Sequence, residues 1–149
     1  MPAFRLIRAV ALTADEAWLR VTDWRAHAAQ VPLTSLASVT GSPTGMGTVF
    51  VVRSGLGPLG FDDPMEVVHW EPPADGEPGH CRLEKHGRVI TGWAEIEVRP
   101  EGPGSVVVWR EELGVRLLPR LLDPLVVRVG RRVFGRALDG LLAGTGPGA

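Results

Sequence analysis

The sequence predicts an α+β domain built on an antiparallel sheet. Apolar residues recur every three or four positions over residues 117–142, which is the period of a helix. Segments that alternate with a period of two fill residues 34–113. No strand–helix–strand alternation separates these segments, so the strands are expected to pair as antiparallel hairpins. A chain of 149 residues can bury one core, and we expect a single domain over residues 1–149.

The long C-terminal helix is the element around which the rest is organised. Its predicted buried stripe consists of Leu118, Leu121, Leu122, Leu125, Val129, Val133, Ala137 and Leu141, and its arginines fall mostly on the other side. Asp123-Pro124 is typical of a helix start, although a start at Pro119 is also compatible with the pattern. Gly144 is expected to end the helix, and residues 144–149 to form a flexible tail. A helix of about twenty residues spans roughly 30 Å and needs a broad apolar partner surface.

The other elements follow from local signals in chain order. Residues 3–12 alternate as a strand, and Thr13 with Glu16 forms a capping box at the start of a short helix. A second short helix is expected from Trp24 to Gln30, capped by Asp23 or Thr22 and ended by Pro32. The six further strands are predicted at 34–39, 48–54, 61–70, 80–86, 89–99 and 105–113. The third of these is expected to break or bulge near Asp63-Pro64, because proline cannot donate to the ladder.

Composition excludes several classes of function. The net charge of −1 provides no field that would attract nucleic acid or an anionic membrane. Arginines are concentrated between Arg116 and Arg136, and we interpret them as the solvated face of the helix. No run reaches the roughly 18 apolar residues of a membrane span, and the N-terminus lacks a cleavage signal. A cytoplasmic protein, monomeric or homodimeric and without a cofactor, is therefore expected.

The residue types that usually carry catalysis are sparse. Cys81 is the only cysteine, so neither a disulfide nor a cysteine metal cluster is possible within the chain. The four histidines lie in different elements without metal-ligand spacing, so no metal site is expected. Asp62 and Asp63 form an acidic pair that Arg53 could reach, although aspartate is also a common turn residue.

Six short strings, in this order and spacing, resemble those of a known superfamily. They are ADEAW, VTDWRAHAAQVP, GMGTVF, MEVVHWEPP, SVVVWREEL and LLDPLV. The chain is similar over nearly its whole length to the START-like, helix-grip superfamily of polyketide cyclases/dehydrases and lipid-transport proteins (SRPBCC, Bet v 1-like). The resemblance implies a curved seven-stranded antiparallel sheet around the C-terminal helix, with two short helices between strands 1 and 2. It also implies a pocket between sheet and helix, but the superfamily's functions are too diverse for the fold to choose among them.

Strand alternation, oriented by this resemblance, selects the residues that would face the pocket. In the fifth strand, for example, Cys81 and Leu83 are expected to point inward rather than Arg82 and Glu84. Gly92 and Ala94 are small and would leave space. The predicted ligand-binding residues are Trp24, His27, Phe50, Val52, Leu83, Ile90, Gly92, Ala94, Ile96, Val107, Trp109, Glu111, Leu122, Leu125 and Val129. A densely filled core with little cavity is the alternative.

Glu111 is the acid with the greatest chemical interest, because it lies on the predicted inward face between Trp109 and Leu113. We expect it to pair with an arginine from the long helix or with Arg88, which would make it structural. An unpaired Glu111 would instead have a raised pKa and could act as an acid or base.

Three functions follow from these expectations. The first is binding of a small hydrophobic ligand, possibly aromatic or lipid-like, between sheet and helix. The alternative is an aromatase/cyclase-type enzyme acting on a polyketide, with Glu111 and His27 as catalytic candidates. The third is a protein-interaction module with a filled core, whose surface would be Leu56, Leu59 and the arginine face of the helix.

Overall fold

Seven antiparallel strands form one sheet in the order β1-β7-β6-β5-β4-β3-β2 in the computed structural model, which describes residues 2–41, 43–55, 57–116 and 118–143. The strands are β1 (Ala3–Val10), β2 (Thr34–Thr40), β3 (Val49–Ser54), β4 (Phe61–Glu71), β5 (Gly79–His86), β6 (Ile90–Glu101) and β7 (Gly104–Val115). From β2 to β7 each strand pairs with the next along the chain. β1 closes the other edge by pairing with β7. The predicted α+β helix-grip fold is confirmed.

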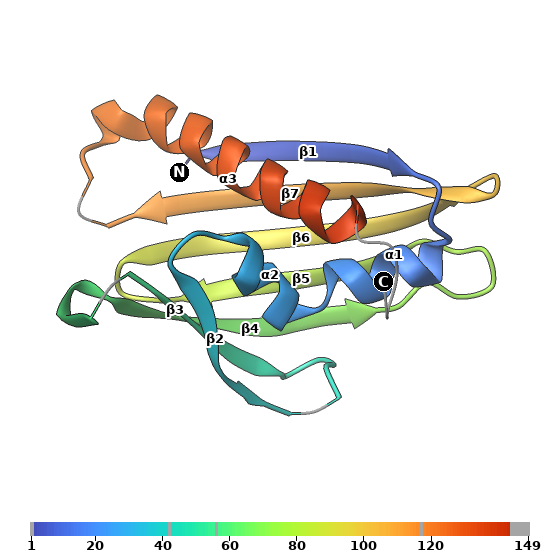
Figure 1. Cartoon of the computed structure of the whole chain (residues 1–149), viewed down its shortest axis with the longest axis horizontal. Coiled ribbons are helices and arrows are strands. Elements are labelled where there is room, and N and C mark those ends of the chain that lie inside the picture. The colour runs from blue at the N-terminus through green and yellow to red at the C-terminus, as the bar shows by residue number, and fades with distance from the viewer. Residues whose placement is uncertain (1, 42, 56, 117, 144–149) are drawn as a thin grey trace.

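Three α-helices cover one face of the curved sheet (Figure 1). They are α1 (Ala14–Val21), α2 (Trp24–Gln30) and α3 (Asp123–Ala143), and short 3-10 turns, η1 (Gly57–Leu59) and η2 (Arg120–Leu122), precede β4 and α3. α3 crosses the strands diagonally, while α1 and α2 lie beside its C-terminal half (Figure 1). None of the helices in the described ranges is both long and apolar enough to span a bilayer.

The two short helices begin where the capping signals predict. The Thr13 hydroxyl oxygen accepts the Glu16 backbone N–H at 3.2 Å, and the Glu16 carboxylate accepts the Thr13 hydroxyl at 2.9 Å. Asp23 caps α2, because its Oδ1 accepts the Ala26 N–H at 3.1 Å. These bonds satisfy backbone donors that a helix start otherwise leaves free.

The expected break or bulge is not found at Asp63-Pro64. β4 pairs with β3 in continuous register through Pro64, which faces Val51. The irregularity lies further on, between Val67 and His69, where one residue of β4 is unpaired against β5. Because a bulge moves later side chains to the other face, both Val67 and Trp70 point toward the core.

The buried side of α3 differs from the predicted stripe. Its buried residues are Val126, Gly130, Gly135, Ala137, Leu138, Leu141 and Leu142. Leu125 and Val129 are instead 52% and 51% exposed, so their prediction as buried wall residues is wrong. A spacing of four overshoots a turn of 3.6 residues by about 40° per step. A stripe followed at that spacing therefore faces solvent at the start of the helix and reaches the core only at Ala137 and Leu141.

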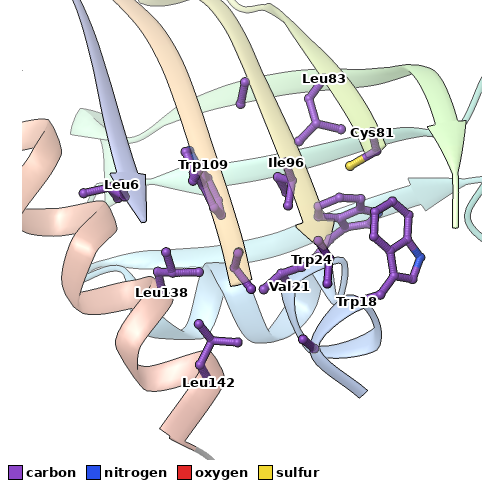
Figure 2. Close-up of a cluster of buried hydrophobic side chains, with 14 of the residues drawn as sticks. Leu6, Trp18, Val21, Trp24, Cys81, Leu83, Ile96, Trp109, Leu138 and Leu142 are labelled. Carbon is purple, nitrogen blue, oxygen red and sulfur yellow. The ribbon is translucent and has the colours of Figure 1, made fainter. Parts of the chain in front are cut away.

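The core lies between the sheet and the helices. Figure 2 shows Leu138 and Leu142 of α3 with Val21 of α1 on one side and Leu6 and Ile96 of the sheet on the other. Gly130 lets α3 approach β1 closely, since a Cβ at this position would lie 3.0 Å from the Phe4 ring. The predictions for Leu56, for the helix end at Gly144 and for the tail concern positions outside the described residues.

Candidate functional site

A cavity of about 160 Å³ lies between the sheet, α2 and α3. Every strand from β2 to β7 contributes to its wall. The lining residues are Trp24, His27, Ala28, Val31, Thr34, Phe50, Val52, Ser54, Asp63, Met65, Leu83, Lys85, Ile90, Ala94, Trp109, Glu111, Leu113 and Phe134. The core is therefore not completely filled. The alternative expectation, a densely filled core with little cavity, required it to be.

Many residues predicted to face a ligand do line this cavity. They are Trp24, His27, Phe50, Val52, Leu83, Ile90, Ala94, Trp109 and Glu111. The alternation of β3, β5, β6 and β7 brings the strand residues to one face, as the register of the sheet requires. α2 holds Trp24 and His27 against them, with the Trp24 ring stacked on Phe50 at 4.7 Å between centroids.

The other predicted positions lie elsewhere. Ile96 and Val107 are fully buried in the packed core, beyond the cavity wall. Gly92 has a backbone role rather than a space-making one. Its φ is +125°, and a Cβ would lie 1.8 Å from the Glu112 carbonyl oxygen. From the predicted helix wall, Leu122, Leu125 and Val129 are all absent from the lining, and the lining residue from α3 is Phe134.

Two charged residues in the lining were missed, Asp63 and Lys85. Lys85 follows Cys81 and Leu83 at alternate positions of β5, so the same alternation extended by one step places it inward. Asp63 precedes Met65 and Val67 on the inward face of β4, and the expected break at Pro64 obscured that pattern. Charged residues rarely occupy inward positions of a sheet. A charged residue that falls in the inward alternation therefore stands out in the sequence, and this could have identified Asp63 and Lys85.

Asp63, Lys85 and Glu111 form a buried group of charged side chains, which we call the cavity triad. Their exposed fractions are 5%, 8% and 1%. β4, β5 and β7 hold them, with Lys85 directly opposite Met65 and Glu111 directly opposite Ala94. Buried charged groups normally have close partners, so each remaining unsatisfied atom requires an explanation.

The cavity triad is incompletely satisfied. The buried atoms Asp63 Oδ1, Glu111 Oε2 and Trp24 Nε1 have no hydrogen-bond partner. The Lys85 ammonium lies 3.9 Å from the Met65 sulfur and 5.9 Å from the centre of the Phe134 ring. Within the described ranges, neither acid makes an ion pair with Lys85 or with an arginine. The expected pairing of Glu111 with an arginine is therefore wrong.

Burial controls the ionisation of the two acids. Desolvation raises the pKa of Glu111, an effect that the Lys85 charge and a hydrogen bond from Trp109 Nε1 partly offset. Desolvation also raises the pKa of Asp63, again against the charge of Lys85. Two carboxylates that share one cation cannot both be fully compensated. The cavity therefore contains carboxyl groups that can exchange a proton closer to neutral pH than exposed acids do.

His27 is held neutral. Its Nε2 donates to the Val21 carbonyl oxygen, which leaves Nδ1 without a proton. Burial lowers the pKa of His27 to about 4, despite the opposing effects of that hydrogen bond and of Asp23. The ring lies 4.9 Å from Trp109 between centroids. At neutral pH His27 can accept a hydrogen bond, but its low pKa makes it a weak base.

Nucleophilic and metal-binding groups contribute little to the site. Burial raises the pKa of the Cys81 thiol to about 12, so this side chain stays protonated. Among the described residues, no group of three or more histidine, cysteine or acidic side chains is placed to hold a metal ion. Arg53 pairs with the exposed Asp62 at 3.0 Å, which leaves Asp63 to the cavity.

Solved structures with the same architecture are numerous. Protein CV1439 of Chromobacterium violaceum has a TM-score of 0.71 at 13% identity and covers 99% of each chain. The Zhui aromatase/cyclase of Streptomyces sp. R1128 has a TM-score of 0.66 at 14% identity, over 95% of this chain and 91% of that one. Norcoclaurine synthase of Thalictrum flavum, with a transition-state analogue, has a TM-score of 0.61 at 18% identity, over 95% and 93%.

These likenesses extend over 95–99% of the chain but are remote in sequence. No protein-family model matches the chain, and no curated protein matches it in sequence. At such identities a structural likeness establishes the fold and not the activity. The chain has the helix-grip fold of the START-like, Bet v 1-like superfamily.

Proposed function

We propose that the protein binds a small aromatic molecule carrying one hydroxyl group, which it holds at the cavity triad. The observation behind this proposal is the set of unpartnered buried atoms, Asp63 Oδ1 and Glu111 Oε2, which interact with the Lys85 charge in a mostly apolar cavity. A buried polar atom without a partner costs about 1–3 kcal/mol. A ligand that supplies the missing partner recovers this free energy on binding.

Cavity size argues for a single ring. The volume of about 160 Å³ is close to that of an engineered apolar cavity of about 150 Å³ that accepts benzene. Drug-sized ligands need about 300–1,000 Å³. A polycyclic polyketide would require the cavity to widen, whereas a monocyclic phenol fits it as it stands.

Charge and ring geometry argue for a phenol over a hydrocarbon. A phenolic O–H can donate to Glu111 Oε2 while its oxygen accepts from Lys85, so a single group satisfies both sides. The stacked pair Trp24–Phe50 and the ring of Trp109 offer flat apolar surfaces to the rest of the molecule. The remaining predicted ligand-binding residues on this wall, Val52, Leu83, Ile90 and Ala94, would supply apolar contacts.

Two names among the structural neighbours are compatible with this proposal. An aromatase/cyclase and norcoclaurine synthase share the fold. The likeness adds support for a ligand between sheet and helix and leaves the ligand's identity to experiment. The proposal places the protein in the cytoplasm, as a monomer or homodimer, without a cofactor.

Isothermal titration calorimetry with 4-methylphenol and toluene tests the proposal, because the two differ by one hydroxyl group. We expect the phenol to bind about tenfold or more tightly, since a hydrogen bond to a charged group is worth about 1.5–3 kcal/mol. Glu111→Gln and Lys85→Met should each reduce this preference. The neighbouring Glu112→Gln, outside the cavity lining, serves as the matched control and should leave it unchanged.

Two results would reject this assignment. Equal affinities for toluene and the phenol would show that the cavity triad does not contribute to binding. Unchanged affinity in Phe50→Trp, which adds volume inside the lining, would show that the ligand binds elsewhere.

A second candidate function, acid–base catalysis on a ketone of similar size, rests on the unpartnered Glu111 carboxyl. A carboxyl with a raised pKa beside an ammonium can move a proton while the cation stabilises an enolate. The test is deuterium exchange at the α C–H of cyclohexanone, a single-ring ketone whose uncatalysed exchange is slow, followed by NMR. Catalysis predicts that wild type accelerates the exchange and that Glu111→Gln does not. Equal exchange rates with both proteins would reject the catalytic role and leave ligand binding as the only function.

A further inference from the structure

The segment that leads into α3, together with the first turns of α3, presents large apolar side chains to solvent. Leu118, Leu121, Leu125 and Val129 are 44%, 88%, 52% and 51% exposed. Leu121, Leu125 and Val129 follow one another at intervals of four residues, so they lie along one side of the helical segment. Core packing does not account for them, because α3 buries the opposite side through Val126 and Gly130. A contiguous apolar strip of this kind indicates a partner surface.

Unpaired arginines surround this strip. Residues 116–136 contain six arginines, all exposed, and one acid, Asp123. The six are Arg116, Arg120, Arg128, Arg131, Arg132 and Arg136. In the described part of the chain none of these six forms an ion pair, whereas Arg8, Arg53, Arg82 and Arg99 each do. We call the four apolar residues and these six arginines the basic apolar face.

The net charge of the chain does not reveal the positive charge of the basic apolar face. The whole chain carries a net −1, so the residues outside this face are acidic in sum. The expectation that the net charge gives no attraction to an anionic membrane does not take this uneven distribution of charge into account. A field is set by where the charges lie, and exposed like charges within about a Debye length of one another act together.

We infer that the basic apolar face docks on the surface of an anionic lipid bilayer. An amphipathic helical face with leucines flanked by arginines lies in the plane of the interface, with its apolar residues among the acyl chains and its cations at the phosphates. A second copy of the chain fits less well, because a two-fold contact would bring six unpaired arginines against six more. Nucleic acid would pair the arginines but leave the leucines against phosphates.

The position of this face agrees with membrane docking. The start of α3, the β3–β4 loop and the β5–β6 turn lie at the same end of the molecule (Figure 1). The β3–β4 loop adds another exposed leucine, Leu59, which is 86% exposed. The cavity reaches this end, because Ser54 at the end of β3 and Ile90 at the start of β6 both line it. An apolar molecule dissolved in the bilayer would thus have a short route to the cavity.

Vesicle sedimentation tests the inference with a protein of residues 1–149 and no added ligand. The vesicles are phosphatidylcholine alone or with about a quarter phosphatidylglycerol, at about 0.15 M salt. We expect binding at least about tenfold stronger to the anionic vesicles, and its loss near 1 M salt, where charges are screened beyond about 3 Å. Leu121→Ser with Leu125→Ser should reduce binding about tenfold, as should Arg128→Gln with Arg132→Gln.

Matched controls use exposed residues of the same types elsewhere. Leu19→Ser on α1 removes a leucine that is 70% exposed, and Arg25→Gln with Arg110→Gln removes two exposed arginines. These controls should bind like wild type. The inference fails if anionic vesicles do not bind the protein, or if the controls weaken binding as much as the changes on the face. It also fails if sedimentation velocity shows a dimer that Leu121→Ser with Leu125→Ser dissociates. Failure of phenol binding would leave this result untouched, because no ligand is present.

Discussion

Trp109 Nε1 donates a hydrogen bond of 3.2 Å to Glu111 Oε1, two residues further along β7, while Oε2 of the same carboxyl has no partner. Alternation along the strand places both side chains on the inward face, and both line the cavity. One oxygen of Glu111 is therefore fixed by the protein and the other is left for a ligand or a proton.

The first prediction concerns Glu111→Gln. Because burial raises the pKa of Glu111 in the folded state, folding favours the protonated acid. The raised pKa of Glu111 does not affect the free energy of unfolding below the unfolded pKa of about 4.3. It lowers that free energy increasingly as the pH rises above this value. Glutamine keeps the acceptor for Trp109 without a charge, so the variant should be at least as stable as wild type at pH 7. Urea denaturation between pH 4 and 8 measures this difference, and the two curves should converge at the acidic end.

A variant clearly less stable than wild type at pH 7 would mean that Glu111 is ionised and compensated, most directly by Lys85. Lys85→Met distinguishes the cases, because losing the Lys85 charge raises the pKa of Glu111 in both but destabilises the fold at pH 7 through Glu111 only if that acid is ionised there. Carboxyl chemical shifts followed by NMR report that titration.

The second prediction concerns His27. Its pKa of about 4 lies below the unfolded value of about 6.5, so the unfolded state binds the proton first. Stability associated with neutral His27 is complete above pH 6.5 and is lost as the pH falls toward 4. His27→Gln should flatten the pH dependence of stability in this window relative to wild type. An NMR titration in which the His27 imidazole of the folded protein titrates near pH 6.5 would contradict the burial argument.

The third prediction compares two leucines on α3. Leu138 is fully buried, and Leu138→Ala should cost about 2–5 kcal/mol of unfolding free energy. Leu125 is half exposed, and Leu125→Ala should stay within about 0.5 kcal/mol of wild type. Thermal and urea unfolding of the pair give the comparison. Similar losses in both variants would show that the outer side of the helix also packs against something.

The fourth prediction concerns Gly92. An alanine here would hold a β-carbon 1.8 Å from the Glu112 carbonyl oxygen at a φ of +125°. Gly92→Ala should therefore cost about 3 kcal/mol or more, or prevent folding altogether. Gly102→Ala is the matched control, since Gly102 also has a positive φ of +57° but open space around it. The control should lose only about 1–2 kcal/mol, the cost of a left-handed residue. Equal losses would assign the whole effect to φ and none to the close approach.

Local patterns predict this fold well because each strand and cap is encoded within a few residues. The strand predicted at 48–54 is observed as Val49–Ser54, and Thr13 and Asp23 cap the helices at the expected positions. The face of α3 escapes such reasoning, because its first turns are apolar on both sides. Only the approach of β1 to Gly130 shows which side is buried.

The residues of the candidate site also differ in whether the sequence predicts them. Its apolar wall follows from alternation, as for Leu83, Ala94 and Trp109. The cavity triad does not, because sequence reasoning assigns a lysine or aspartate to solvent unless a partner is visible. Asp63 and Lys85 are brought to Glu111 by pairing across β4, β5, β6 and β7, which is a property of the register of the sheet rather than of any one strand.

The pairing of β1 with β7 has a consequence for biosynthesis. Ala3 is aligned with Glu112, so the first strand of the sheet has its partner in the strand of the sheet that is made last. The hairpins from β2 to β7 can close one after another as the chain leaves the ribosome, but β1 must wait, exposed, for β7. Chaperones that hold short apolar segments would find Phe4 and Leu6 accessible throughout this interval. A circular permutant that begins at β2 and joins β1 behind α3 would change this order while keeping every contact of the sheet.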